Sequence, residues 1–435
     1  MLTIWVDEHS PRIDYTFEVL SQLMGEWPIA IQTQSPDPEL PYINYRSELV
    51  PGAFNLPCSG LLVEEHIRSD APVHSGKGEN LQLFSTLKGS WDIPFDLPAA
   101  AFHLLTDYEK YQVDHFDDHA RYDPKAYPSS EYGLEQIPVV HHWAQMLKTA
   151  LSKRFPKLKE LPHLKSPPPY EITVDIDQPW RYQHKGKLDF WGGWLKDFMQ
   201  GNWEEARRRG QTFEGQKDPN DTFDILFELI PPERGTFFCL LGGSRPPDSR
   251  FNEHTPAFRE LIQHIQHQGY QLGIHPSYHS FLNPNLINQE AQSLGSITGK
   301  SPTFSRQHYL RYRLPNTFRS LLSAGIKQDY SLCLYLSGGF PQGMARAFPW
   351  FDLAQNKETS LMLHPTILMD RSLMQYAQLT PQQAMKRAQT LLLTTQKYLG
   401  TFTLLIHNDA LSEMGEWRGW GHTLRNCLIQ VRNLS

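Results

Sequence analysis

The sequence of 435 residues contains only four cysteines, at positions 58, 239, 333 and 427, and none of them forms a CxxC pair. Scattered thiols of this kind argue against a disulfide framework and are typical of structural side chains in a reducing compartment. No stretch approaches 18 uninterrupted apolar residues, so the sequence predicts no membrane span. The opening segment MLTIWVDEHS lacks the basic and apolar regions of a signal peptide, and we therefore expect a cytoplasmic protein.

Positive charge is also scarce. The 41 Lys and Arg residues are outnumbered by 47 Asp and Glu residues, which gives a formal net charge of -6. An acidic chain is not attracted over long range to nucleic acid or to an anionic membrane, so we expect neither as a main partner. Hydrophobic residues at 40% and charged residues at 20% are typical of a folded globular protein. The length favours two domains.

Residues 1–165 are predicted to form a smaller α+β domain. Short apolar runs at Leu2–Trp5, Ala53–Asn55 and Gly60–Val63 alternate with turns and with a helical segment at Tyr15–Leu23. Apolar residues at helical spacing over Val139–Phe155 predict the last helix of this domain, and the proline-rich segment Ser166–Tyr170 predicts a stiff linker. No catalytic spacing occurs here. The sequence leaves open whether this domain binds a substrate or partner, or covers the second domain.

Residues 170–435 show a different pattern, in which short apolar strands alternate with helices. The predicted strands are Glu171–Val174, Gly235–Leu240, Tyr270–Gly273, Ile326–Lys327 and Phe402–Ile406. The predicted helices are Phe223–Leu229, Ala257–His267, Asn316–Ser323 and Pro381–Leu399. This alternation predicts an α/β fold with a parallel sheet and crossover helices, most simply a complete or incomplete (β/α) barrel. In such a barrel the chemistry gathers at the carboxyl ends of the strands.

Two carboxylates follow the first of these strands, in the segment Thr173-Val174-Asp175-Ile176-Asp177. Because side chains alternate along a strand, Asp175 and Asp177 are expected on the same face. Two carboxylates this close after an apolar strand are unfavourable unless a positive charge lies near them. A divalent metal ion is the simplest such charge, and a solvated surface pair is the alternative.

Two histidines, His275 and His279, follow a later predicted strand. Pro276 suits the first position of a helix, so we expect His275 at the strand end and His279 about one turn later. Histidines four residues apart on a helix can bind one ion, at N–metal distances of about 2.0–2.1 Å. The segment is not an HExxH motif, because Pro276 stands where that motif needs Glu. Chance spacing in a chain with 19 histidines is the alternative.

A third histidine, His407, follows the apolar strand Phe402–Ile406. A histidine at a barrel rim is a natural general acid or base, because its pKa lies near working pH. A hydrogen-bonded structural histidine is the alternative. All three patterns fall at predicted strand ends, and they therefore support one another.

In this order, Thr-x-Asp-x-Asp, His-x-x-x-His, Arg, Asp and Leu-x-His resemble the motifs of the NodB-homology polysaccharide deacetylases, carbohydrate esterase family four, over roughly residues 170–430. The resemblance implies a deformed (β/α) barrel and a metal ion, commonly zinc, bound by one Asp and two His. By position it implies that Asp177, His275 and His279 hold the metal. It also implies that Asp175 is the catalytic base and His407 the general acid.

Three departures from the family pattern bear on these roles. Ile176 separates the two aspartates, which are usually adjacent, so their roles could be exchanged. Ser305-Arg306-Gln307-His308-Tyr309 replaces the usual Arg-x-Pro-Tyr, and Arg306 is expected to orient the base. Asp329-Tyr330-Ser331 replaces the usual Asp-x-x-Asp-Trp, and Asp329 is expected to tune the acid.

The expected activity is metal-dependent removal of an acetyl or related acyl group from an N-acetylated carbohydrate or a similar amide. Cytoplasmic placement favours a soluble biosynthetic intermediate over a wall polymer as substrate. One alternative is an inactive barrel retained as a carbohydrate-binding module, because the Arg and Asp motifs are altered. Another is a non-haem iron enzyme, because two histidines and a carboxylate also form its facial triad; the predicted helices argue against the jelly-roll pattern expected of such an enzyme.

Overall fold

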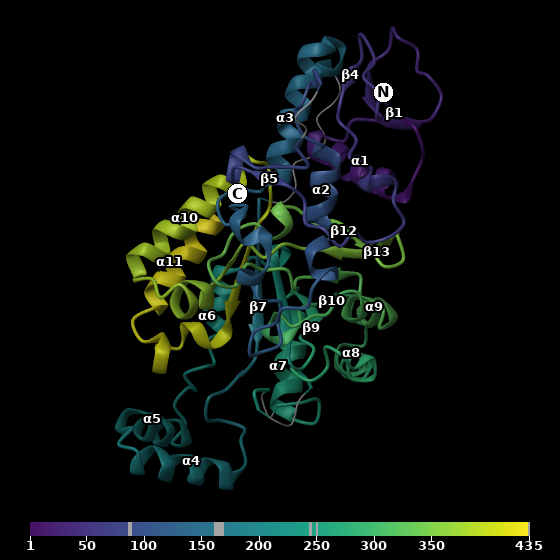
Figure 1. Cartoon of the computed structure of the whole chain (residues 1–435). Helices are drawn as coiled ribbons and strands as arrows, with labels where there is room; N and C mark the ends of the chain where they lie inside the picture. Colours follow the sequence, from purple (N-terminus) through teal and green to yellow (C-terminus); the bar gives the residue numbers. More distant parts are fainter. Residues whose placement is uncertain (86–88, 161–168, 243–245, 249–250, 434–435) are drawn as a thin grey trace.

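The computed structural model describes residues 1–85, 89–160, 169–242, 246–248 and 251–433 (Figure 1). Most of the predicted linker at 166–170 lies outside these residues. Among the helices described, none is both long and apolar enough to cross a membrane.

The amino-terminal region is built on a four-stranded sheet that is parallel throughout, in the order β2-β1-β3-β4. Its strands are β1 (Leu2–Val6), β2 (Ile29–Gln32), β3 (Tyr42–Tyr45) and β4 (Phe54–Asn55). Its helices are α1 (Pro11–Met24), α2 (Leu97–Leu105) and α3 (Val139–Arg154), and a small antiparallel ladder joins β5 (His74–Ser75) to β6 (Gln82–Leu83). The strand predicted at Gly60–Val63 is instead a 3-10 turn, Leu61–Val63.

The boundaries of α1 follow from its capping residues. The Ser10 side chain accepts a hydrogen bond from the amide of Ile13, and Pro11 occupies the first helical position, where a missing N–H costs nothing. Gly25 ends the helix in the left-handed conformation, at φ 103°. The helix then packs on the second region, where the Tyr15 hydroxyl donates to the Pro349 carbonyl at 2.8 Å.

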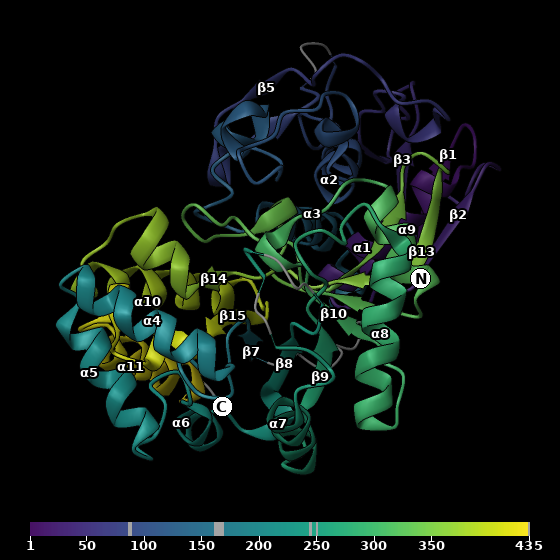
Figure 2. The same cartoon turned by 90° about the horizontal axis from the view of Figure 1, so that it is seen from below.

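The second region is a nine-stranded sheet in the order β12-β13-β11-β10-β9-β8-β7-β15-β14, parallel except for β12. Its strands are β7 (Tyr170–Ile176), β8 (Gly235–Cys239), β9 (Gln271–Ile274), β10 (Phe304–Ser305), β11 (Gln328–Asp329), β12 (Phe348–Asp352), β13 (Lys357–Leu363), β14 (Leu368–Met369) and β15 (Phe402–His407). The helices α6 (Phe223–Leu229), α7 (Pro256–His267), α8 (Pro284–Thr298), α9 (Asn316–Ser323), α10 (Pro381–Lys397) and α11 (Gly421–Arg432) surround it (Figure 2).

One continuous segment, residues 357–369, closes this sheet into a ring. At its beginning β13 pairs with β11, and at its end β14 pairs with β15. Between the two strands, the Thr366 amide donates to the Leu332 carbonyl and the Ile367 amide to the Thr403 carbonyl, at 2.8 and 2.9 Å. The predicted fold class is therefore confirmed: a deformed (β/α) barrel preceded by a smaller mixed region.

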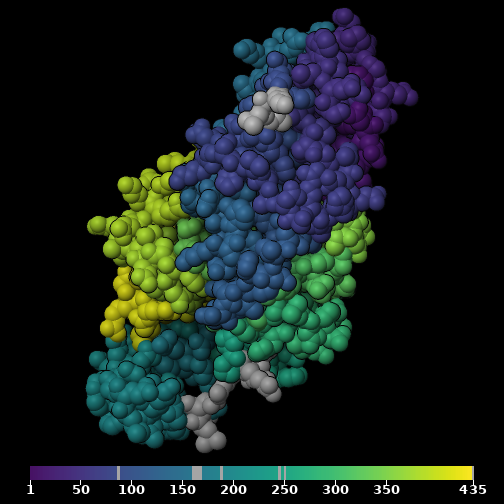
Figure 3. All heavy atoms as spheres, in the orientation of Figure 1, coloured from purple at the N-terminus to yellow at the C-terminus, as the bar shows by residue number. Residues whose placement is uncertain are grey.

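A helical hairpin projects from the barrel between β7 and α6 (Figures 1 and 3). It consists of α4 (Lys187–Met199) and α5 (Trp203–Phe213). Arg181 and Glu205, with a closest contact of 2.8 Å, tie it to the chain that follows β7. Trp191, Met199 and Trp203 lie on its exposed surface.

The amino-terminal region and the barrel share one hydrophobic core. The ring centroid of Phe351, near the end of β12, lies 5.0 Å from that of Tyr15 and 5.2 Å from that of Phe102. Buried His141 of α3 joins the two parts through polar contacts: its Nδ1–H donates to the Tyr398 carbonyl at 3.0 Å, and its Nε2 accepts from the Ala345 amide at 3.1 Å. The amino-terminal region is thus firmly packed over the barrel.

Candidate metal centre

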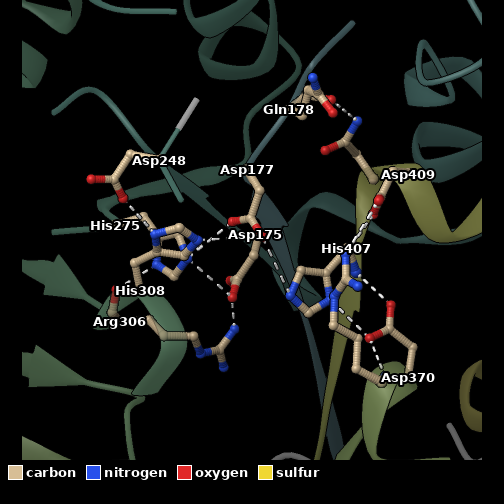
Figure 4. A network of polar contacts seen from close by, with 12 residues as sticks. Asp175, Asp177, Gln178, Asp248, His275, Arg306, His308, Asp370, His407 and Asp409 are labelled. Atoms are coloured by element: carbon tan, nitrogen blue, oxygen red, sulfur yellow. Dashed lines mark hydrogen bonds and ion pairs between the residues drawn. The ribbon is translucent and has the colours of Figure 1, made fainter. Parts of the chain in front are cut away.

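Five polar side chains converge where the barrel strands end (Figure 4). Asp175 is the second-last residue of β7, and Asp177 directly follows that strand. His275 follows β9, His308 lies three residues beyond β10, and His407 is the last residue of β15. Because parallel strands deliver their carboxyl ends to one rim of the barrel, residues up to 232 positions apart in the sequence meet there.

Hydrogen bonds at the far side of each ring orient His275 and His308. The Nδ1 atom of His275 lies 2.5 Å from the Arg306 carbonyl oxygen, and that of His308 lies 2.7 Å from Oδ1 of Asp248. Both partners can only accept, so Nδ1 carries the hydrogen in each ring. In a neutral imidazole, Nε2 then holds a lone pair, which is the arrangement seen in metal-binding histidines.

The two Nε2 atoms face the carboxylate of Asp177. His275 Nε2 lies 3.1 Å from Asp177 Oδ1, and His308 Nε2 lies 3.7 Å from Asp177 Oδ2. One ligand atom from each of these three residues lies within 4.8 Å of the other two. Atoms bound to a common zinc ion at about 2.0–2.2 Å are about 3–4 Å apart, so the spacing suits one ion.

Two of these facing atoms, His275 Nε2 and Asp177 Oδ1, are buried and have no hydrogen-bond partner. Two acceptors at 3.1 Å repel each other unless a cation lies between or beside them. The donor set of two imidazoles and one carboxylate is that of a catalytic zinc site with an open position. These three residues therefore fit a divalent metal ion.

The electrostatics of the centre also favour a cation. Burial by itself raises the pKa of Asp177, but the neighbouring His308, His275 and His407 outweigh burial and hold that pKa well below its usual range. Burial lowers the pKa of His308, yet the carboxylates of Asp177 and Asp248 reverse this and raise it to about 9. The aspartates thus stabilise positive charge, which either a proton or a metal ion can supply.

Asp175 is held at the edge of this cluster by Arg306. Both side chains are almost fully buried, and Arg306 Nη1 donates to Asp175 Oδ1 at 2.9 Å. The other guanidinium nitrogens donate to the Tyr330 carbonyl and the Thr366 hydroxyl, both at 3.1 Å. Asp175 Oδ2 remains directed toward the cluster, 3.6 Å from His275 Nε2. The structure therefore brings Arg306 and Asp175 into direct contact, and the role of Arg306 in orienting a base stays a prediction.

On the opposite side, His407 is held by Asp370. The His407 Nδ1–H donates to Asp370 Oδ1 at 2.8 Å, and its Nε2 lies 3.7 Å from Asp177 Oδ2. Burial lowers the pKa of His407, but the Asp370 carboxylate more than compensates and raises it to about 9. A protonated imidazole is thus stabilised beside the cluster.

The structure corrects the predicted position of His279. This side chain is exposed, and its recorded ring contact is with Tyr278 rather than with the cluster. No helix starts at Pro276: the chain turns through 276–282, and α8 begins only at Pro284. Without a helical turn, His279 is not brought beside His275, and His308 occupies the third position instead.

Asp329 is also placed differently from its prediction. It is buried at the end of β11, where its carboxylate accepts from the Ser305 hydroxyl at 2.7 Å and the Ser331 amide at 2.9 Å. The segment 357–369 lies between β11 and β15, so the carboxylate that reaches His407 is that of Asp370, which directly follows this segment.

The sequence analysis did not identify His308 and Asp370 as site residues, because each of them follows a very short strand. His308 stands in the altered Arg motif, and Asp370 directly follows the apolar run Ile367-Leu368-Met369. Two-residue strands give no recognisable alternation, which is why these strand ends were not found.

The centre opens into a cavity of about 350 Å³. Two side chains in its wall, His119 and Arg121, come from the amino-terminal region. His119 Nδ1 lies 3.3 Å from the Tyr278 hydroxyl, and Arg121 donates to the Tyr376 hydroxyl at 3.0 Å. The region in which the sequence showed no catalytic pattern therefore forms part of this wall.

Comparison with known proteins gives three results. Residues 2–156 match a family model described as "Family of unknown function (DUF7033)". No curated protein matches the chain. Solved structures give several matches of low similarity.

A putative polysaccharide deacetylase from Mycobacterium smegmatis is 16% identical, with a TM-score of 0.39, over 60% of this chain and 82% of that one. A probable polysaccharide deacetylase from Pseudomonas aeruginosa PAO1 is 10% identical, with a TM-score of 0.38, over 61% and 84%. A polysaccharide deacetylase from Bacillus cereus is 14% identical, with a TM-score of 0.31, over 61% and 86%. At such values the case for function rests on the geometry of the centre itself.

Proposed function

We propose that this protein is a metal-dependent hydrolase that removes an acetyl or related acyl group from the nitrogen of an acylated carbohydrate or similar amide. One observation carries the proposal: a three-residue metal site of Asp177, His275 and His308 lies between two oriented groups of opposite function. These are the carboxylate of Asp175, held by Arg306, and the imidazole of His407, held by Asp370. Amide hydrolysis requires a base and an acid on either side of the scissile bond.

A metal ion held by Asp177, His275 and His308 supplies Lewis acidity toward the amide carbonyl and lowers the pKa of water from 15.7 toward about 7. Asp175 takes the proton of the attacking water through its free Oδ2. Arg306 fixes the orientation of this carboxylate by donating to its other oxygen at 2.9 Å.

His407 completes the reaction as the acid. Its protonated Nε2 gives a proton to the amide nitrogen as the C–N bond breaks, so the products are a carboxylic acid and a free amine. Asp370 fixes the ring so that Nε2 faces the cluster and stabilises its charge at Nδ1. His407 and Asp175 thus have complementary roles, one as the proton donor and the other as the proton acceptor.

Two alternatives remain distinguishable by experiment. A non-haem iron enzyme can use the same ligand set. Such an enzyme does not need the acid pair of His407 and Asp370. An inactive carbohydrate-binding barrel does not need the buried pair of Arg306 and Asp175, which burial makes costly to retain.

The test begins with elemental analysis of the purified protein. We expect one divalent metal ion per chain, removed by a chelator and restored by zinc. Acetate release from N-acetylglucosamine, chitooligosaccharides and nucleotide-linked N-acetyl sugars is then measured with and without chelator. Metal binding without acetate release from any of these substrates would favour the inactive carbohydrate-binding barrel. Bound iron with oxygen-dependent colour changes would favour the non-haem iron enzyme.

A further inference from the structure

A second cavity of about 320 Å³ lies between the amino-terminal region and the barrel, beside the metal centre. We name it the interdomain cavity. The amino-terminal region contributes residues between positions 103 and 135 to its wall, and the barrel contributes residues between positions 310 and 342. Its apolar wall includes Leu104, Tyr122, Leu134, Leu332, Leu334 and Leu336. Its volume is within the range of small-molecule sites, roughly 300–1,000 Å³, and such sites are frequent between domains.

Leu310 and Arg121 line both the interdomain cavity and the cavity of the metal centre. Leu310 belongs to a small apolar cluster with Tyr335, Met369 and Leu405, which is separate from the main core. Met369 and Leu405 face the metal cavity, whereas Tyr335 faces the interdomain cavity. The two cavities are therefore separated by a partition about one side chain thick, formed by Leu310 with its apolar neighbours and by Arg121.

Several charged side chains in the wall of the interdomain cavity already have partners. Lys110 pairs with Asp107 at 2.7 Å, and Arg121 pairs with Asp117 at 2.7 Å. The Glu109 carboxylate accepts from the Tyr132 hydroxyl at 3.0 Å. These charges are satisfied within the protein, so an uncharged apolar group is the occupant that the cavity accommodates at least cost.

The two sides of an N-acylated sugar differ in polarity, and so do the walls of the metal cavity. Most of that wall is polar, with Asp248, His119 and Gln307 among its residues, whereas Leu310, Met369 and Leu405 form its apolar part. A carbohydrate matches the polar wall, and an acyl group matches the apolar one. The acyl chain of a bound amide is therefore directed toward the partition beside the interdomain cavity.

We propose that the preferred substrate carries an N-acyl chain longer than acetyl, and that this chain extends past Leu310 into the interdomain cavity. The inference rests on the proposed function. The reaction is the same hydrolysis: the oxygen of water bonds to the acyl carbon, the C–N bond breaks, and the nitrogen takes a proton. The products are a medium-chain carboxylic acid and a free amino sugar.

The experiment uses the full-length zinc-loaded protein with N-acetyl-, N-butanoyl- and N-hexanoylglucosamine as substrates. A buried methylene is worth ~0.8 kcal/mol, which corresponds to about fourfold in kcat/KM for each added methylene that enters the cavity. We expect kcat/KM to rise from acetyl to hexanoyl. If acetyl is cleaved and the longer chains are cleaved more slowly, the inference is overturned while the proposed function stands.

A cavity-filling variant separates this cavity from the metal centre. Leu134 is 6% exposed and lines the interdomain cavity. L134W is expected to abolish the preference for hexanoyl while leaving metal content and hydrolysis of the acetyl substrate within about twofold. L134M, which keeps the volume nearly constant, is the matched control and is expected to retain the preference.

Binding of hexanoate, the expected product, tests the cavity without any turnover. By titration calorimetry on the zinc-loaded protein, we expect hexanoate to bind at least tenfold more tightly than acetate, and this advantage to be lost in L134W. Equal affinities for the two acids, or a hexanoate affinity that L134W does not change, would overturn the inference even if no amide substrate were cleaved. Failure of every amide substrate with intact hexanoate binding would instead count against the proposed hydrolysis.

Discussion

The carboxylate of Asp370 accepts two hydrogen bonds from His407, one from its backbone amide at 2.7 Å and one from Nδ1–H at 2.8 Å. One side chain thus fixes both the end of β15 and the orientation of the imidazole. The pair joins residues 37 positions apart, at the ends of neighbouring parallel strands. It leaves Nε2 of His407 facing Asp177, which is where a proton donor to the leaving amine is needed.

Substitution of this pair is expected to reduce turnover without emptying the site. H407Q removes the proposed acid, and general acid catalysis contributes about 10²–10⁴-fold, so kcat should fall by that factor. D370N keeps the size of the side chain but loses its charge, and we expect a smaller fall, roughly tenfold to a hundredfold, which is typical of the loss of a carboxylate that supports a functional histidine. D329N, which alters the aspartate that does not contact His407, is the matched control. A larger fall in D329N than in D370N would contradict the assignment.

Metal binding should depend on His308 and not on His279. H308A removes a ligand whose Nε2 faces Asp177, and we expect elemental analysis to show less than a tenth of the metal in the wild-type protein. H279A alters an exposed side chain outside the cluster and should keep full metal content. Full metal in H308A together with an empty site in H279A would restore the ligand set expected from the sequence alone.

Substitutions of Asp175 and Asp177 should have different effects on metal content and turnover. D175N is expected to retain the metal and lose turnover by about 10²–10⁴-fold, because it removes the proposed base and not a ligand. D177N is expected to lose the metal, because this carboxylate faces both histidine ligands. Metal content and acetate release are measured on the same preparations. An empty site in D175N with full metal in D177N would mean that the two roles are exchanged.

The buried His141 predicts a pH dependence of stability away from the metal centre. Burial lowers its pKa from 6.5 to about 4. Below pH 6.5 the unfolded chain takes up a proton that the folded protein does not, so stability is present above pH 6.5 and is lost as the pH falls toward 4. The full loss is roughly 3 kcal/mol, since each pKa unit corresponds to about 1.4 kcal/mol.

The measurement compares the wild-type protein with H141Q by urea unfolding between pH 7.5 and 4.5. Glutamine does not titrate, so the difference in the free energy of unfolding should shrink by most of those roughly 3 kcal/mol as the pH falls. Other titrating groups contribute equally to both proteins and cancel. A difference that stays constant across this range would show that His141 titrates normally in the folded protein.

The sequence alone determined the parts of this protein that depend on local patterning. The helices at Phe223–Leu229 and Asn316–Ser323 were predicted to the residue, and the strands that deliver Asp175 and His407 were located correctly. Apolar runs and helical periodicity, bounded by turn residues, can be recognised without tertiary structure. They were sufficient to predict a parallel (β/α) barrel with polar residues at its strand ends.

Tertiary structure decided which of those polar residues meet. His308 and Asp370 follow strands of two residues, which are strands only because longer neighbours pair with them. His279 was predicted beside His275 because a proline suits a helix start, but the chain turns there instead. The closure of the ring by residues 357–369 places Asp370, and not Asp329, against His407. The packing of the amino-terminal region brings Arg121 to the cavity wall. The sequence could not predict this position, because it depends on contacts between segments far apart in the chain.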